Sequence, residues 1–397
     1  MVNPIIVLYL SEVISLGDNL ILNFFSRSKL NFKISDESRW PESKKLNSLK
    51  FFFIFLLIGL NLFNNKYIFC VILDLIIYKT RLMISNLSII IPFYNAEKFI
   101  NKNFYSCLKI LKNINAEVIY VDNLSNDNSY IKIKKKIKNY KNFSIFKIPK
   151  KFKNSPGIAR NIGIKNENLK NIIFLDIDDE LVINNPKKFN NYIKKNKSNI
   201  IFIKKKIIKK NKSLVDEKSP FIKFNKYNLS VFFSKSINMA VISIIFNKNF
   251  ILKKKIFFQK GIYEDILFIF KAHYYNEKKI GFLDSIIYKK NLHSNSITNS
   301  KLSINHLRYM FLAWKNINEF LKKKLNKKEY NKVKTAIQFR LRGEFANEYN
   351  KIINSNIKQP KRKQFINFIV NKYKSVIIPG FKVLTKKDKI AQSVLKI

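Results

Sequence analysis

The stretch LSIIIPFYN at residues 87–95 decides the fold: an apolar run ends in Pro92 and Phe93, and the polar residues Tyr94 and Asn95 follow. Three further short apolar runs lie at residues 117–121, 143–148 and 171–175. Four apolar residues at three- and four-residue spacing separate the first run from the second: Ile100, Phe104, Leu108 and Leu111. This spacing is typical of one face of a helix that covers a sheet. Since parallel neighbours need a crossover of about a dozen residues, strand, helix and strand in this order predict parallel βαβ units and an α/β fold.

Polar side chains follow three of the predicted strands at the point where each strand ends. Tyr94 and Asn95 follow the first strand, Asp122 follows the second, and Asp176 and Asp178 follow the fourth. In parallel sheets, ligands bind outside the carboxyl ends of the strands. We therefore expect a binding site at this edge of the sheet.

Three carboxylates are close together after the fourth strand, at Asp176, Asp178 and Asp179. Carboxylates this close repel one another unless a cation lies between them, and oxygen ligands with diphosphate oxygens suit Mg²⁺ or Mn²⁺. The alternative is a solvated turn that caps the next helix, for which Asp is a suitable residue. On spacing alone, the turn is the more frequent case.

Two further groups could contact an anion or move a proton. The segment SPGIARN at 155–161 predicts a turn that leads into a helix, where amide groups and Arg160 can meet a phosphate. The alternative there is a plain Pro-Gly turn with an exposed arginine. Glu264 and Asp265 stand at the start of another predicted helix, where adjacent carboxylates supply a general base or simply favour the helix dipole.

The chain is strongly basic, with 76 Lys and Arg against 26 Asp and Glu in 397 residues, a net charge of +50. A hydrophobic content of 47% is enough for a folded core, so a disordered basic tail is excluded. Such charge can bind nucleic acid, but the lysine runs are scattered rather than gathered in one patch, at 134–136, 204–206, 253–255 and 322–324. Solvated faces are the favoured interpretation. Attraction to an anionic membrane surface, worth about 1 kcal/mol per basic residue, also fits.

Cysteines and histidines give few constraints. Cys70 and Cys107 form neither a CxxC pair nor a zinc spacing, which fits a reducing cytosol. The three histidines are too dispersed for a HExxH-type site, so any metal must depend on carboxylates.

Residues 1–82 differ from the rest of the chain. Two apolar runs, at 51–63 and 67–78, are each shorter than the roughly 20 residues that span a bilayer, and the second contains Asp74. Two interpretations stay open: a membrane-associated segment, or a non-native extension upstream of a true start at Met83.

Residues 301–397 are Lys-rich and have helical periodicity, which predicts a helical C-terminal region. Its apolar stripes are expected to be packing faces, although a basic amphipathic helix can also lie on a membrane. One stripe consists of Leu307, Met310, Phe311 and Trp314.

Five segments, in this order, resemble the motifs of family 2 glycosyltransferases with the A-type nucleotide-sugar fold. They are SIIIPFYN at 88–95, VDNLSND at 121–127, SPGIARNIG at 155–163, FLDIDDEL at 174–181 and GIYEDILF at 261–268. The resemblance covers residues 83–300, and the segment 288–298 is similar to the one that closes the family's site. It implies a Rossmann-like mixed sheet with flanking helices and the transfer of a sugar from a nucleotide-sugar.

The resemblance also assigns residues to the nucleotide. It implies that Pro92, Tyr94 and Glu97 border the nucleotide. Asp122 would accept a hydrogen bond from a uracil-type base, and Asp176 would contact the ribose.

Other residues would serve the reacting groups. Arg160 would lie near the diphosphate, and Asp178 would ligate a divalent Mn²⁺ or Mg²⁺, with His293 approaching from the closing segment. Asp265 would be the catalytic base, with Glu264 as the substitute candidate. A single displacement with one base inverts the anomeric carbon and needs no covalent enzyme intermediate.

The expected function is therefore an inverting, metal-dependent transfer of one hexose or N-acetylhexosamine from a UDP-sugar. The acceptor would be a saccharide or lipid-linked saccharide of bacterial surface polysaccharide or lipopolysaccharide synthesis, at the inner face of the cell membrane. No QxxRW-type motif follows Asp265, which favours a single addition over processive synthesis.

Two departures from the family pattern keep alternatives open. Asn123 replaces the second carboxylate of the strand-two motif, and Leu124 replaces its Gly. These two departures leave open that the protein is a transferase homologue that binds nucleotide but does not catalyse transfer. A non-enzymatic basic protein that binds nucleic acid or a membrane surface is the other alternative, and it leaves the ordered motifs unexplained.

Overall fold

The computed structural model describes residues 87–152, 155–209, 212–216, 226, 228–234, 239–292 and 302–396. The chain divides into two units, Met1–Leu75 and Ile76–Ile397, and all described residues belong to the second. The expectations for residues 1–82, including both apolar runs and Cys70, lie outside the described residues. The same holds for the start at Met83 and for His293.

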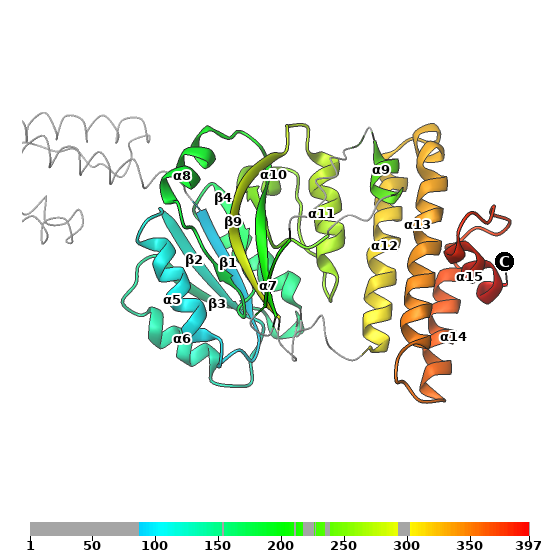
Figure 1. The fold of residues 1–397 in the computed structure, drawn as a ribbon, viewed down its shortest axis with the longest axis horizontal. Helices are drawn as coiled ribbons and strands as arrows, with labels where there is room; N and C mark the ends of the chain where they lie inside the picture. Colours follow the sequence, from blue (N-terminus) through cyan, green and yellow to red (C-terminus); the bar gives the residue numbers. More distant parts are fainter. Residues whose placement is uncertain are drawn as a thin grey trace, which may run out of the picture. The chain divides into compact units, whose positions relative to one another are not determined.

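Within the described residues, nine strands form one mixed sheet in the order β3-β2-β1-β4-β8-β6-β9-β5, with β7 paired to β6 (Figure 1). The strands are β1 (Leu87–Phe93), β2 (Ala116–Asp122), β3 (Phe143–Lys147), β4 (Asn171–Phe174), β5 (Glu180–Leu181), β6 (Ile200–Lys209), β7 (Lys212–Asp216), β8 (Ile244–Asn247) and β9 (Gly281–Leu292). The pairs β1–β2, β1–β4 and β2–β3 are parallel, which confirms the expected βαβ units.

The second half of the sheet depends on long-range pairing. Strand β8 is antiparallel to both β4 and β6, whereas β6 and β9 are parallel with register shifts. Strand β9 continues past β6 to pair with β5 in antiparallel register. This places β9 beside the residues that follow β4.

Helices cover both faces of the sheet. One core contains side chains of α5 (Ile100–Leu111), α6 (Ser129–Ile137) and α8 (Pro186–Lys195). The opposite core contains side chains of α7 (Pro156–Asn166), α10 (Lys248–Lys253) and α11 (Glu264–Tyr275). The expected apolar face of α5 is rotated slightly, since Ile100, Phe104, Cys107 and Ile110 are its buried apolar residues.

A further core contains four C-terminal helices: α12 (Ile304–Lys324), α13 (Lys327–Ile353), α14 (Lys361–Lys374) and α15 (Lys386–Leu395). Leu307, Phe311 and Trp314 of α12 are buried in it, so this apolar stripe is a packing face. Short helices α9 (Leu229–Ser234) and η3 (Lys150–Phe152) complete the elements that the structure describes.

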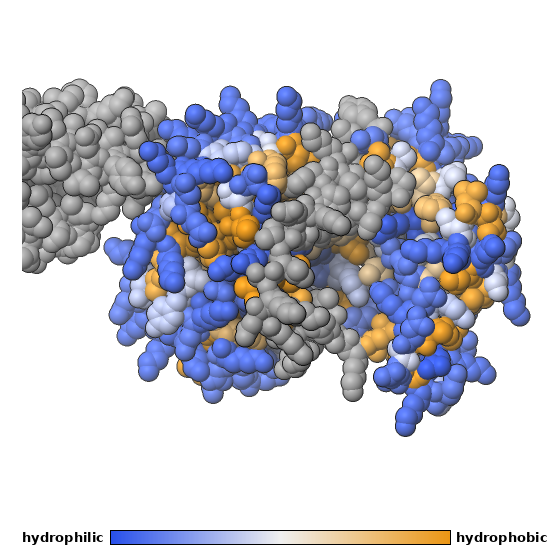
Figure 2. Space-filling view, in the orientation of Figure 1, coloured by the Kyte–Doolittle hydropathy of each residue, from blue (hydrophilic) through white to orange (hydrophobic). Residues whose placement is uncertain are grey.

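On the face seen in Figure 2, hydrophilic residues are spread over the described part of the chain rather than gathered in one area. Among the described residues, none of the helices combines the length and the apolar character needed to cross a bilayer.

Candidate active site

The loops after β1 and β2 are joined by side-chain hydrogen bonds. The backbone N–H of Asn95 donates to Ser125 Oγ at 3.0 Å, and the N–H of Asn126 donates to Asn95 Oδ1 at 2.8 Å. Asn95 has φ 46°, a left-handed conformation that asparagine tolerates better than most residues. The two loops therefore form one rim at the carboxyl edge of the sheet.

The residues expected to border the nucleotide lie on or beside this rim. Pro92 is buried in β1, whereas the side chain of Tyr94 is exposed immediately after the strand. Glu97 accepts a hydrogen bond from Lys132 Nζ at 2.8 Å, so its carboxylate is held against α6. Its backbone N–H donates to Asp127 Oδ2.

Asp122 ends β2 and is fully buried. Its Oδ1 accepts a hydrogen bond from the backbone N–H of Ser125 at 2.9 Å. Its Oδ2 has no hydrogen-bond donor among the described residues, and Lys147 Nζ lies 4.0 Å away. A buried acceptor without a donor is unfavourable by about 1–3 kcal/mol, so an N–H group of a ligand would find a prepared partner here.

The departures at Asn123 and Leu124 are accommodated by the backbone. Asn123 donates from its N–H to Phe93 O, and its Oδ1 accepts from the N–H of Ser155 at 3.0 Å. Leu124 has φ 63°, the left-handed region that favours glycine. Leu124 thus adopts the left-handed conformation that glycine would usually adopt in this turn. The side chain of Asn123 holds Ser155, the residue that precedes α7.

Arg160 on α7 joins three carboxylates from distant parts of the chain. It is 6% exposed, so the alternative of an exposed arginine is wrong. Nη1 donates to Glu264 Oε1 at 2.5 Å and Asp265 Oδ1 at 3.4 Å, and Nη2 donates to Asp176 Oδ1 at 3.1 Å. Burial opposes its charge, but Asp265, Glu264 and Asp176 outweigh burial and raise the pKa of Arg160 above its ordinary value.

The two adjacent carboxylates of α11 differ in access. The side chain of Glu264 is 7% exposed, whereas that of Asp265 is 23% exposed. Burial, reinforced by Asp265, raises the pKa of Glu264 to about 7 against the opposing charge of Arg160. Burial also raises the pKa of Asp265, whose Oδ2 accepts from the N–H of Val241 at 3.2 Å. Asp265 is therefore the more accessible of the two carboxylates.

Close contact between α7 and the segment before α11 makes this arrangement possible. A Cβ on Gly157 would lie 2.6 Å from Gln259 O and 2.7 Å from Glu264 Cγ, so no larger residue fits. Asn161 exchanges two hydrogen bonds of 2.9 Å with the backbone of Phe258. The sequence signals for this contact were the Gly and the Asn of SPGIARN, and we did not predict a role for either.

The acidic cluster after β4 brings Asp176, Asp178 and Asp179 together, with one oxygen of each within 4.8 Å of the others. Asp176 and Asp178 are half-buried, and carboxylate oxygens are the ligands that Mg²⁺ and Mn²⁺ prefer. The residues present therefore fit a divalent cation.

Asp179 links the cluster to β9, which we did not predict. It is buried; its Oδ2 accepts from Tyr288 Oη at 2.6 Å, and its Oδ1 accepts from the N–H of Asn291 at 2.7 Å. Tyr288 Oη also accepts from the N–H of Asp176, and Asn291 Nδ2 donates to Asp178 O at 2.9 Å. Burial, with the charges of Asp176 and Asp178, raises the pKa of Asp179 to about 7. Strand β9 thus fixes the acidic cluster in place.

Residues 88–257 match the sequence model of the family described as Glycosyl transferase family 2. Residues 88–257 of this chain are thus similar to family 2 glycosyltransferases. The matched range contains the first four of the five motifs and ends shortly before Glu264 and Asp265.

Two curated proteins are similar in sequence. The poly(ribitol-phosphate) beta-N-acetylglucosaminyltransferase TarP of Staphylococcus aureus (strain N315) is 31% identical over 176 residues, which cover 43% of this chain and 52% of TarP. An uncharacterized glycosyltransferase of Haemophilus influenzae is 39% identical over 93 residues, covering 23% of this chain and 36% of that protein. The chain thus matches about half or less of the length of these relatives.

Solved structures of S. aureus TarS share the fold. TarS 1-349 in complex with UDP-GlcNAc has a TM-score of 0.56 at 20% identity, covering 78% of this chain and 86% of that one. TarS 1-349 in complex with UDP has a TM-score of 0.53 at the same identity. The expected glycosyltransferase A-type α/β fold, a Rossmann-like mixed sheet with flanking helices, is confirmed.

Proposed function

We propose that this protein is an inverting glycosyltransferase that transfers one sugar from a UDP-hexose or UDP-N-acetylhexosamine to a saccharide acceptor. The observation that carries the proposal is the convergence on Arg160 of Asp176, which follows β4, and of Glu264 and Asp265 on α11. In this proposal, Asp176 would serve the donor and Asp265 would serve the acceptor, and their contacts with Arg160 would keep the two close together.

The donor would bind along the rim formed after β1 and β2. Asp122 Oδ2 is the acceptor available to a uracil N–H, and Pro92, Tyr94 and Glu97 would border the nucleotide. Asp176 would meet the ribose. Because TarP is named a β-N-acetylglucosaminyltransferase and TarS was solved with UDP-GlcNAc, UDP-GlcNAc is the first donor to test.

A divalent Mg²⁺ or Mn²⁺ would be held by Asp178 with Asp176, and by His293 from the closing segment. When bound, the ion supplies positive charge that stabilises the leaving diphosphate. Arg160 would lie near the same diphosphate. Its N–H groups already serve three carboxylates, so it also fixes Asp176 and Asp265 relative to each other.

Asp265 would act as the base. The acceptor oxygen forms a bond to the anomeric carbon, the bond from that carbon to the diphosphate oxygen breaks, and UDP leaves with the electron pair. Asp265 takes the hydroxyl proton, and its exposed fraction of 23% gives the hydroxyl access. Glu264, hydrogen-bonded to Arg160 and almost fully buried, is the substitute candidate.

The net charge of the chain and the names of its relatives support a proposal for the acceptor and for the location of the protein. TarP is named for poly(ribitol-phosphate), a phosphate-bearing polymer, and a net charge of +50 favours anionic partners. We propose an acceptor in surface polysaccharide or lipopolysaccharide synthesis, free or lipid-linked. We also propose a cytoplasmic protein held peripherally at the inner face of the membrane.

Calorimetric titration of UDP tests the site directly. UDP is titrated into the full chain with Mn²⁺ and then with chelator, beside Asp178→Ala. Asp284→Asn on β9 is the matched control, since this carboxylate is exposed and pairs with Lys204. We expect metal-dependent UDP binding that Asp178→Ala loses and Asp284→Asn keeps. Absence of UDP binding under both conditions would refute the proposed donor.

A further inference from the structure

A pocket of about 450 Å³ lies where the carboxyl ends of α11 and α12 meet the turn after α10. The helices α11 and α12 run side by side (Figure 1). Seven residues line this lysine pocket: Lys253, Lys254, Lys255, Lys271, Tyr275, Phe320 and Lys324. Five of the seven are cations and none is acidic.

The turn after α10 presents three of these lysines. The N–H of Ile256 donates to Ile251 O and the N–H of Lys255 donates to Leu252 O, both at 3.0 Å, which is the hydrogen-bond pattern of a Schellman motif. Lys255 has φ 50° at the position where this motif usually has glycine. A lysine therefore stands in a left-handed conformation, and Lys253 and Lys254 precede it on the same turn.

Within the part of the chain that the structure describes, no carboxylate neutralises the charges of the pocket. Among the described residues, none of the five lysines forms an ion pair. Two acidic residues that are close in sequence to the pocket residues form ion pairs with other lysines. Glu319 lies 3.3 Å from Lys322, and Glu277 lies 3.5 Å from Lys226. Lys271 is half-buried, and burial together with the charge of Lys324 lowers its pKa.

Two aromatic rings form an apolar wall beside these charges. The ring centroids of Tyr275 and Phe320 lie 5.8 Å apart at an interplanar angle of 87°. Lys254 Nζ lies 5.7 Å from the Tyr275 ring, and Lys271 Nζ lies 5.5 Å from the Phe320 ring. The pocket thus offers ammonium groups and a ring surface to the same ligand.

We propose that the lysine pocket binds a phosphate-bearing group, a diphosphate or a phosphodiester, at a site separate from the donor site. Lysine ammonium groups bind phosphate as point charges, and several of them match a group that carries more than one negative charge. The volume is within the range of about 300–1,000 Å³ typical of small-ligand sites.

The lysine pocket is distinct from the candidate active site. Lys271 follows Glu264 by seven residues on α11, which places it about 10 Å further along the helix axis at 1.5 Å per residue. The carboxylates stand at the start of α11, and the lysines stand towards its end. A donor diphosphate at the acidic cluster and a phosphate at the lysines can therefore bind together.

Pyrophosphate, titrated calorimetrically in the presence of chelator, is the probe. Chelator removes any metal that could hold it at the acidic cluster. The test variant is Lys254→Gln/Lys271→Gln/Lys324→Gln in the full chain. We expect the Kd to rise about tenfold or more, because charge-assisted contacts to phosphate are the strong ones.

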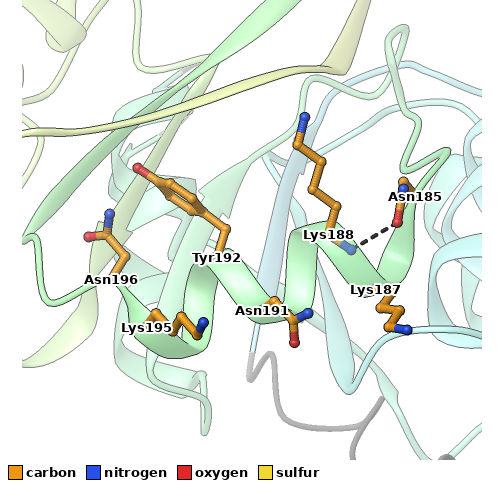
Figure 3. A pocket seen from close by; sticks show the side chains of 7 residues that line it. All are labelled: Asn185, Lys187, Lys188, Asn191, Tyr192, Lys195 and Asn196. Carbon is orange, nitrogen blue, oxygen red and sulfur yellow. Dashed lines mark hydrogen bonds between the residues drawn. The ribbon is translucent and has the colours of Figure 1, made fainter.

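A control variant changes the charge equally elsewhere. Lys187, Lys188 and Lys195 line a groove of about 580 Å³ on the single helix α8, with Asn and Tyr side chains between them (Figure 3). Changing these three to Gln should leave pyrophosphate binding within about twofold of the wild type. Equal weakening by both variants, or no pyrophosphate binding by the wild type, would overturn the proposal.

Two further measurements complete the test. If Lys271→Gln disturbs folding, as judged by thermal melting, the pair Lys254→Gln/Lys324→Gln replaces the triple variant, since both side chains are exposed. UDP with Mn²⁺ should bind equally to the wild type, the lysine-pocket variant and the α8 variant. Failure of UDP with every protein would count against the proposed transferase, whereas the pyrophosphate comparison would still decide the lysine pocket.

Vesicles identify the source of the phosphate. Sedimentation with phosphatidylglycerol vesicles that falls for the lysine-pocket variant but not for the α8 variant supports the site and assigns it to a lipid headgroup. Pyrophosphate binding with equal vesicle binding by both variants supports the site and assigns it to a soluble phosphate ester.

Discussion

At the scale of residues, burial and the charge of Arg160 act in opposite directions on the pKa values of the neighbouring carboxyl groups. One buried guanidinium faces three carboxylates, so the acids share a single positive charge and burial raises the pKa values of Glu264 and Asp265. A carboxylate with a raised pKa is a stronger base when ionised, which suits proton removal from an acceptor hydroxyl. Since Asp265 is the more exposed of the two acids, it is the one that we propose as the base.

Asp265→Asn tests this selection. We expect kcat for sugar transfer to fall by about 10²–10⁴-fold because general base catalysis is lost. Metal-dependent UDP binding should persist, since Asp265 does not belong to the acidic cluster. Transfer is measured by release of UDP and binding by calorimetry, with Asp284→Asn as control. Full turnover in Asp265→Asn would exclude it as the base.

The buried carboxyl group of Glu167 predicts how the stability of the protein depends on pH. Its side chain is fully buried, with Lys248 Nζ at 3.1 Å, and burial raises its pKa from 4.5 to about 7. Between about pH 4.5 and 7 the folded protein therefore binds more protons at this site than the unfolded chain, so the stability it contributes falls as pH rises. Glu167→Gln should remove this part of the pH dependence, at most about 3 kcal/mol. Thermal melting at several pH values measures it, and an unchanged slope would contradict the prediction.

At the scale of elements, the contact between α7 and the segment before α11 positions Glu264 and Asp265. The contact requires Gly157 because the backbone of Gln259 and the side chain of Glu264 occupy the space of a Cβ. Strand β9 has the corresponding role for the acidic cluster, which Tyr288 and Asn291 hold through Asp179. Both contacts join elements that are far apart along the chain.

Gly157→Ala should therefore harm both stability and activity. We expect a loss of about 1–3 kcal/mol, typical of overpacking, and a lower kcat because Glu264 is displaced. Gly343→Ala in α13 is the matched control: its Cβ would meet Lys387 Cδ only at 3.9 Å. Alanine in that helix should be neutral or stabilise by up to about 1 kcal/mol. Chemical denaturation and UDP release measure the two effects, and equal behaviour of both variants would contradict this role of Gly157.

At the scale of the whole molecule, the C-terminal helices share a core with the helix that carries Glu264 and Asp265. Ile266, Leu267 and Phe270 of α11 belong to the same apolar cluster as Leu307 and Phe311 of α12. The helix that carries Glu264 and Asp265 is thus covered by apolar side chains of residues 302–396.

A chain of residues 83–300 should consequently fail to fold cooperatively. Removing the C-terminal helices exposes the apolar side of α11, and large apolar losses exceed the marginal stability of about 5–15 kcal/mol typical of proteins. Residues 83–397 are the control. Thermal melting and UDP binding are the measurements. A cooperative transition of the shorter chain within about 5 °C of the control would show that the region is dispensable.

The sequence alone determined the first half of the sheet and the edge where the site lies. The predicted strands at 87–92, 117–121 and 171–175 coincide with β1, β2 and β4, because short apolar runs and helical spacing are local signals. Strand β9, in contrast, depends on long-range pairing, because it pairs with both β6 and β5.

Only the tertiary structure decided which side chains meet. Arg160 contacts residues 16, 104 and 105 positions away, and Asp179 contacts Tyr288 across 109 positions. The same holds for the lysine pocket, where lysines of two runs that were predicted to be solvated, 253–255 and 322–324, lie together with Lys271. The physical reason is that local propensity and periodicity fix where strands and helices form. The partners of a buried charge depend instead on how distant elements pack in three dimensions.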